Sequence, residues 1–207
     1  MTTPFQWIVD NAIDLSVNRR AVVAQTVARD QTVRSTSRGG QVWRFTINPS
    51  QGILWTTARP YIESLDKADK FTASLINFSN NSGLSYLFGY QGNATSLAGM
   101  TTTYTQGSDT ITISGGTCPS GSILKAGDLL QFAGSQRVYS VVSNVAYNGT
   151  SVQLNRPVLE VSSSGALTVG ASCNFNIICT QFPDWTINPD DRCVKWNGPF
   201  VFFEELA

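Results

Sequence analysis

The chain has 207 residues, with 14 lysines and arginines balanced by 14 aspartates and glutamates, and it contains no histidine. A net charge of zero and a charged fraction of 14% exclude a basic nucleic-acid-binding arm and a polyacidic tail. The lack of histidine excludes a Ser-His-Asp triad, a Cys-His dyad and any histidine-based zinc site. This length, with 42% hydrophobic residues, predicts one packed domain or one domain that carries an inserted module.

The first part of the chain is predicted to be β-rich. Strand patterns are expected within residues 5–18, 21–27, 32–34 and 41–47. In the last of these, Trp43, Phe45 and Ile47 alternate with polar residues and should share a buried face. Glycine and serine at 35–40 predict a turn or flexible loop.

One helix is expected, over residues 59–71. Pro60 suits its first turn, and an apolar stripe that includes Tyr61 and Leu65 recurs at near-helical spacing. A further strand is expected at 83–90.

The pattern changes near residue 101. Short strand-like runs at 8–12-residue spacing, separated by glycine and asparagine turns, predict a small β-barrel at 106–180. Two aromatic-rich strands after residue 181 are expected to return to the first sheet. The predicted fold is therefore mainly β with one short helix: a first domain of 1–105 plus 181–207, and an inserted small β-barrel domain of 106–180.

No signal peptide and no membrane insertion are expected, because no basic segment precedes an apolar run and no apolar stretch reaches about 18 residues. Four scattered cysteines are interpreted as buried free thiols, with a disulfide such as Cys118–Cys173 as the alternative. Their spacing does not fit a metal site, and no cofactor is expected. The four are Cys118, Cys173, Cys179 and Cys193.

Five acidic residues near the C-terminus are candidates for a glycosidase pair of carboxylates. These are Asp184, Asp190, Asp191, Glu204 and Glu205. Asp190 and Asp191 follow Asn188-Pro189 and are expected in a turn, whereas Glu204 and Glu205 are expected in a solvated or interface role. Gly39-Gly40 lacks the Lys-Ser/Thr ending of a phosphate loop. We therefore expect no catalytic residues and no enzymatic activity.

Charge is split along the chain: residues 1–70 carry a net +3 and residues 71–207 a net −3. The basic part contains seven arginines, opposed between 19 and 59 by Asp30 alone. They are Arg19, Arg20, Arg29, Arg34, Arg38, Arg44 and Arg59. They are interpreted either as separate solvated side chains or as a basic surface that meets an acidic surface of a neighbouring copy or partner. Nucleic-acid binding with stacking on Trp43, Phe45 and Trp55 is a third interpretation.

A central run resembles a pattern of tail and baseplate proteins of tailed bacteriophages. It comprises LKAGDLLQF at 124–132, RVYSVV at 137–142 and LNRPV at 154–158. The layout of segment 30–47, the helix at 60–71 and the terminal aromatic strands is similar to the tail-tube fold. The resemblance implies a tail-tube-like antiparallel β-sandwich that assembles into hexameric rings.

This resemblance implies a structural virion protein, assembled in the host bacterial cytoplasm, that forms a ring at the distal tail or baseplate. The insertion favours a distal tail or tube-initiator protein over the repeated tube subunit. Partners would be further copies of the chain, the tail tube, the hub and other baseplate or fibre proteins, while genomic DNA passes through the lumen without sequence-specific binding. The arginines above, with Glu204 and Glu205, are candidate subunit-interface residues. The loop reaching a neighbour would be Ser35, Thr36, Ser37, Arg38, Gly39 and Gly40.

Two other functions stay open. Exposed Trp55 or Trp185 could stack on sugars in a carbohydrate- or receptor-binding β module of a phage tail. Within the structural class, a neck or tail-terminator ring is the other possibility.

Overall fold

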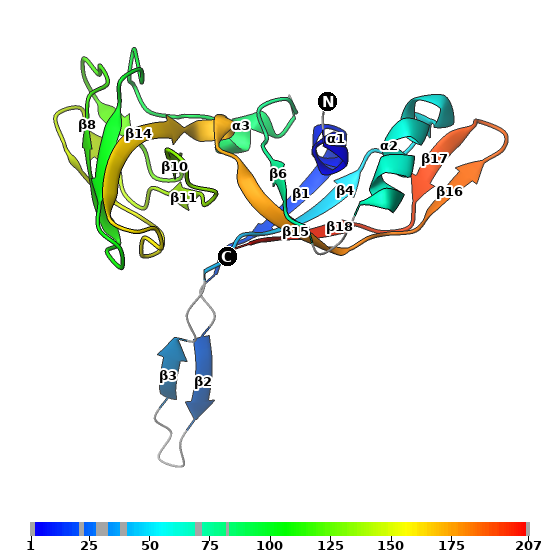
Figure 1. Cartoon of the computed structure of the whole chain (residues 1–207), viewed down its shortest axis with the longest axis horizontal. Coiled ribbons are helices and arrows are strands. Elements are labelled where there is room, and N and C mark those ends of the chain that lie inside the picture. Colours follow the sequence, from blue (N-terminus) through cyan, green and yellow to red (C-terminus); the bar gives the residue numbers. More distant parts are fainter. Residues whose placement is uncertain are drawn as a thin grey trace.

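The computed structural model describes residues 3–20, 23–27, 33–37, 41–68, 72–81 and 83–205. Within these ranges the chain is mainly β, and every pair of neighbouring strands is antiparallel. Two bodies lie side by side along the long axis: a five-stranded sheet covered by helices, and a curled barrel-like sheet (Figure 1). The expected mainly β class with a small barrel is confirmed.

The five-stranded sheet is built from segments of both ends of the chain. Its order is β1-β4-β18-β15-β6, so the last strand of the chain lies at its centre. The strands are β1 (Ala12–Asn18), β4 (Arg44–Pro49), β6 (Ser74–Ile76), β15 (Phe175–Gln181) and β18 (Phe200–Glu204). Two aromatic-rich strands after residue 181 were expected to return to this sheet. One does, because β18 pairs with β4, whereas the segment from Trp185 pairs in a separate three-stranded sheet.

The core of this sheet follows directly from its alternating sequence. Trp43, Phe45 and Ile47 are buried, as expected, while Arg44 between them is exposed. Phe175 from β15 meets both Trp43 and Phe45 edge to face, at ring-centroid distances of 5.3 and 4.9 Å. Aromatic pairs in this geometry add to the stability gained by area burial alone.

The N-terminal segment is a helix, α1 (Pro4–Asp10), and not the start of the expected strand. Phe5, Ile8 and Val9 have helical spacing, and all three are buried. Thr3 caps the helix by accepting a hydrogen bond from the backbone N–H of Gln6 at 3.3 Å, and Pro4 occupies the first turn. The expected strand begins only with β1, in which Leu15 is half-buried while Ile13 and Val17 are exposed, so the expected alternation of burial does not form.

The second helix begins earlier than expected. α2 (Trp55–Lys67) places Pro60 inside the helix and buries Ala58, Ile62 and Leu65, one per turn. Its Tyr61 stacks on Trp7 of α1 with ring centroids 4.7 Å apart, which joins the two helices over the sheet. Where the sequence suggested a strand at 83–90, a short helix forms, α3 (Ser85–Phe88). The chain therefore has more helices than the one expected.

The barrel module has its own sheet and core. Its six-stranded sheet has the order β11-β10-β14-β7-β8-β13, beside a β12–β9 pair. The strands are β7 (Thr101–Tyr104), β8 (Thr110–Ser114), β9 (Ser122–Leu124), β10 (Leu129–Phe132), β11 (Tyr139–Ser140), β12 (Val145–Ala146), β13 (Ser151–Gln153) and β14 (Ser163–Val169). A separate hydrophobic cluster fills it.

The strand pairing shifts the module boundaries relative to the expected 106–180. β7, before residue 106, pairs with β8 and β14 of the barrel sheet, whereas β15, before residue 180, pairs with β6 and β18. A 3-10 turn, Gly170–Ser172, separates β14 from β15. We call residues 90–169 the barrel module and the other described residues the sheet module.

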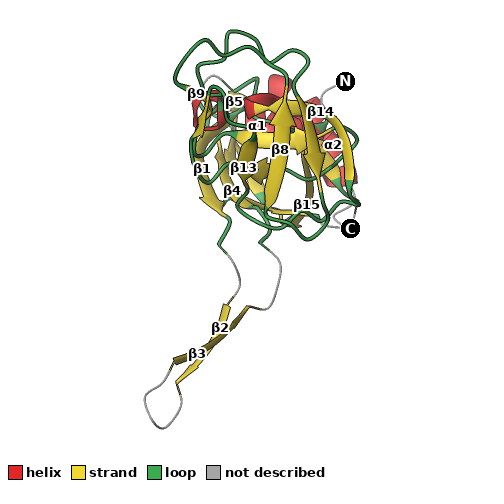
Figure 2. Cartoon of the chain, turned by 90° about the vertical axis from the view of Figure 1, so that its left-hand side faces the viewer, coloured by secondary structure: helices red, strands yellow, loops and turns green. Residues whose placement is uncertain are grey.

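Two smaller ribbons complete the sheet module. β16 (Trp185–Asn188), β17 (Cys193–Trp196) and β5 (Ile53–Leu54) form a three-stranded sheet beside α2. β2 (Val23–Val27) pairs with β3 (Val33–Ser37), and this ribbon stands apart from the rest of the molecule in both views (Figures 1 and 2). Residues 35–37, expected in a loop, therefore lie in a strand.

All four cysteines are free. Cys173 and Cys179 are buried, as expected, whereas Cys118 and Cys193 are half-buried. The Cys173 thiol has no exposed surface, and burial raises its pKa to about 12.

This arrangement predicts the order of thiol modification in the native protein. At about pH 8, a small maleimide should modify Cys118 well before Cys173, because only an accessible thiolate reacts. Peptide mass spectrometry over a time course measures each site, with urea-unfolded protein as the control in which all four react. Rapid labelling of native Cys173, or a Cys118–Cys173 disulfide, would contradict the arrangement.

Candidate functional site

A buried ion pair joins the two modules. Arg156 of the barrel module makes a two-pronged contact with Glu204 of β18, in which NH1 donates to Oε2 and NH2 to Oε1, each at 2.6 Å. Their side chains are 3% and 0% exposed. Planar pairing of this kind is the strongest geometry available to an arginine and a carboxylate. Glu204, expected in a solvated or interface role, is therefore used inside the molecule.

Further hydrogen bonds surround this pair. Arg156 also donates to the carbonyls of Gln41 and Val138, at 2.8 and 3.0 Å. The Val138 carbonyl accepts a second bond, at 2.9 Å, from the indole N–H of Trp43. The backbone N–H of Trp43 donates to Glu204 at 3.2 Å. The Val138 carbonyl of the barrel module thus accepts hydrogen bonds from both Arg156 and Trp43, a core residue of the sheet module.

A second carboxylate continues the network within the barrel. Tyr139 lies beneath the Arg156 guanidinium, 4.9 Å from it, and donates its hydroxyl proton to Glu160. Burial and the bond to Glu160 raise the pKa of Tyr139 well above its usual value. Glu160 also accepts from Ser135. Hydrogen bonds and a ring contact thus link Arg156, Tyr139 and Glu160, while the buried Nε of Arg156 has no hydrogen-bond partner within the described residues.

A basic pocket lies where the two modules meet. It has a volume of about 610 Å³ and is lined by Arg19 and Arg20, just beyond β1, and by Ser140 and Asn155 of the barrel. Arg19 is half-buried: it donates to the Ser140 hydroxyl and lies 5.0 Å from the Trp43 ring. Burial lowers the pKa of Arg19. The amide nitrogen of Asn155 is buried and has no hydrogen-bond partner within the described residues.

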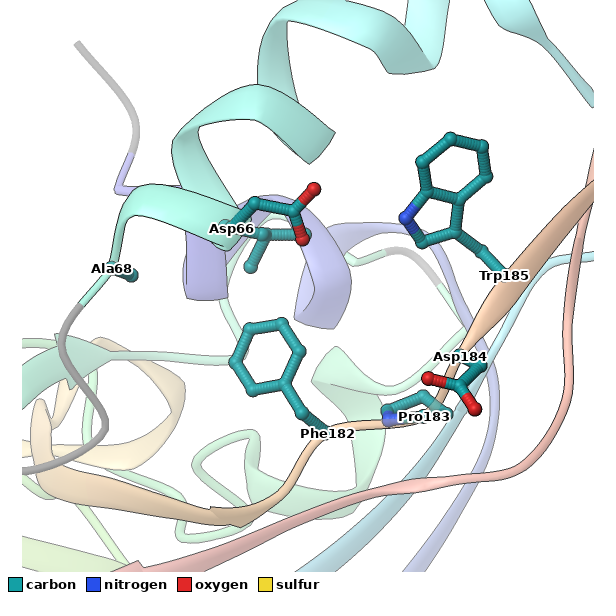
Figure 3. A pocket seen from close by; sticks show the side chains of 7 residues that line it. Asp66, Ala68, Phe182, Pro183, Asp184 and Trp185 are labelled. Atoms are coloured by element: carbon teal, nitrogen blue, oxygen red, sulfur yellow. The ribbon is translucent and has the colours of Figure 1, made fainter.

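An acidic pocket lies at the other side of the sheet module. About 490 Å³ in volume, it is formed by the end of α2 and the segment that joins β15 to β16. Figure 3 shows the carboxylates of Asp66 and Asp184 facing the same opening, beside the rings of Phe182 and Trp185. Trp185 is held by stacking on Trp55, with ring centroids 5.2 Å apart. Carboxylates beside aromatic faces suit a planar cation or a sugar.

The four candidate arginines whose side chains the structure describes lie on different elements. Arg19 and Arg20 share the basic pocket, Arg44 is exposed on β4 over the Phe203 ring, and Arg59 is exposed on α2. Arg34 lies in β3, and Arg29 and Arg38 lie outside the described residues. The arginines that the structure describes are thus spread over several elements.

The remaining candidates fall in two groups. Ser35, Thr36 and Ser37 lie in β3, while Arg38, Gly39 and Gly40 lie outside the described residues. Glu205 is half-buried and accepts a hydrogen bond from the Asn176 amide at 3.1 Å.

Two of the acids that were candidates for a catalytic pair, Asp190 and Asp191, take part in a local turn. Asp191 accepts from the backbone N–H of Cys193 at 2.8 Å, which lowers its pKa and fixes the expected turn between β16 and β17. Asp190 donates its backbone N–H to the side chain of Asn188 at 3.2 Å. In the part of the chain that the structure describes, no three His, Cys, Asp or Glu residues gather as a metal site.

Sequence reasoning did not single out two members of these sites, Arg156 and Asp66. Arg156 is preceded and followed by ordinary turn residues, and its carboxylate partner lies 48 positions later. Asp66 has the pattern of a solvated helix position. The one available signal for Arg156 was its place in the central run, which could not identify the partner.

The Arg156–Glu204 pair predicts a large loss of stability when one partner is removed. Arg156→Met should lower the free energy of unfolding by about 3–5 kcal/mol, because it leaves a buried carboxylate without its counter-charge. The double variant Arg156→Met/Glu204→Met should recover part of that loss. Urea unfolding followed by tryptophan fluorescence measures both. Glu63→Ala, on the exposed face of α2, is the control and should change stability by less than about 0.5 kcal/mol. An Arg156→Met variant as stable as the control would contradict the assignment.

Comparisons with known proteins add no family to these observations. No family model matches the chain, and no curated protein sequence matches it. Among the helices of the described residues, none is long and apolar enough to cross a membrane.

Proposed function

We propose that the protein is a non-enzymatic structural component of a bacteriophage tail, a ring-forming protein of the distal tail or baseplate. The observation that carries most weight is the open edge of the sheet module at β1, beside the projecting β2–β3 ribbon (Figure 1). Within this edge strand, Ile13 is 65% exposed and Val17 is 38% exposed.

An edge strand with exposed apolar side chains is a hazard for a monomer. Its unpaired backbone groups can pair with a second chain, and folded proteins usually shield such an edge with charges, bulges or a covering segment. A register shift between Ala12 and Asp14 interrupts pairing at Ile13, but leaves its side chain in solvent. A neighbouring copy that covers β1 would bury this surface, as ring assembly requires.

The other features fit the same role. The barrel module is fixed to the sheet module by a buried ion pair, which gives a rigid two-part subunit suited to contacting a ring neighbour and a further component. Its position to one side of the sheet supports an outward-facing role in holding baseplate or fibre proteins (Figure 1).

The proposal predicts self-association of the purified chain. Sedimentation equilibrium should give a mass that is a multiple of the 22.4 kDa chain, with six copies expected from the tail-tube resemblance. Antibody labelling of virions in negative-stain images should place the chain at the distal end of the tail; labelling at the neck would favour the tail-terminator alternative. A strict monomer that is absent from tail particles would overturn the proposal.

Carbohydrate binding is the second candidate, favoured by the acidic pocket with its Phe182 and Trp185 rings. If it is correct, a glycan array should give specific binding that Trp185→Ala abolishes and Tyr147→Ala, an exposed aromatic of the barrel, leaves unchanged. Equal binding by both variants, or none by the wild type, would exclude it.

A further inference from the structure

The basic and acidic pockets have complementary chemistry. Among the described residues, Arg19 and Arg20 form no salt bridge, and neither do Asp66 and Asp184. The internal ion pairs are made by other residues: Arg156 with Glu204, and Arg137 with Glu160. Within the described residues, two charges of each sign therefore lie at these pockets without an ion-pair partner.

The acidic pocket fits one guanidinium group. Asp66 and Asp184 supply carboxylate acceptors, and the Trp185 ring supplies a face on which a planar cation can stack (Figure 3). The carboxyl end of α2 adds the negative end of the helix dipole. Lys67 follows Asp66 on the helix, but it does not line the pocket, and neighbouring helix positions face different directions.

Arg20 is the best-placed cation to enter such a pocket. It is exposed, and it lies two residues beyond the end of the open edge strand β1, so a neighbour that covers β1 also meets Arg20. Arg19 is instead held against Ser140 and Trp43, and its side chain lines the basic pocket beside Arg20.

The two pockets cannot meet within one chain. The basic pocket includes Ser140 of β11 and the acidic pocket includes Trp185 of β16, and these strands lie toward opposite ends of the long axis (Figure 1). A contact between two different surfaces of identical subunits is heterologous and closes into a ring when the rotation permits.

We propose that Arg20 of one copy binds in the pocket of Asp66, Asp184 and Trp185 of the next copy. This inference rests on the proposed ring and names its contact. It also accounts for a neutral chain whose charges lie in separate pockets, because each copy supplies the counter-charge of its neighbour.

Charge reversal on each side provides the test. Arg20→Glu and Asp184→Arg change exposed side chains, so both variants should fold, which circular dichroism checks. Each variant alone should associate at least about 30-fold more weakly than the wild type in sedimentation equilibrium, because the contact becomes repulsive. A 1:1 mixture should regain association, since alternating copies place Arg20 against Asp184 and the introduced glutamate against the introduced arginine.

Matched controls separate this contact from a general effect of charge. Arg44→Glu on β4 and Asp109→Arg on the barrel also reverse exposed charges and should leave association unchanged. If the wild type assembles and the two single variants assemble equally well, the contact is wrong and the ring proposal stands. Failure of the mixture to regain association would also overturn the contact. A wild type that stays monomeric at all concentrations would overturn both proposals.

Discussion

The buried pair of Arg156 and Glu204 is the constraint on which the arrangement of the two modules depends. Neither charge can be left without the other in an environment where both side chains are almost fully buried. A pair of apolar residues could hold the modules together equally strongly, but it would lack directional hydrogen bonds. The two parallel hydrogen bonds, with the Val138 carbonyl shared by Arg156 and Trp43, fix one orientation. The basic pocket depends on that orientation, because its walls come from both modules.

The features that could be predicted from the sequence are those in which local pattern and burial coincide. Trp43, Phe45 and Ile47 alternate in sequence and are buried on one face, and the aromatic strand β18 joins the same sheet. The N-terminal helix was missed because its apolar residues fit strand and helix spacing about equally well over so few positions. The expectation for Glu204 was wrong for another reason. Its burial depends on Arg156, which lies 48 residues earlier in the chain, and the residues next to Glu204 do not indicate this partner.

Residues of the central run, which carries the tail-protein resemblance, stabilise the structure of the barrel module itself. Asp128 is buried and accepts hydrogen bonds from the backbone N–H groups of Lys125 and Gln91, at 2.8 and 2.9 Å, while Gly127 adopts a positive φ of 98°. Arg156 is committed to Glu204. Asp128 therefore stabilises a turn of the barrel module, and Arg156 attaches this module to the sheet module. Assembly has to be argued instead from surface residues outside the run, such as those of β1 and the two pockets.

The charges that sum to zero over the sequence are unevenly distributed in the structure. Arg156 and Glu204 cancel inside the molecule, whereas Arg19 and Arg20 remain at one place and Asp66 and Asp184 at another. At physiological ionic strength, charges act over about 8 Å, so a molecule with no net charge still has strong local fields at each pocket. A molecule of zero net charge does not repel its own copies at long range. In the proposed contact, the fields at the two pockets would therefore set how one copy is oriented against the next.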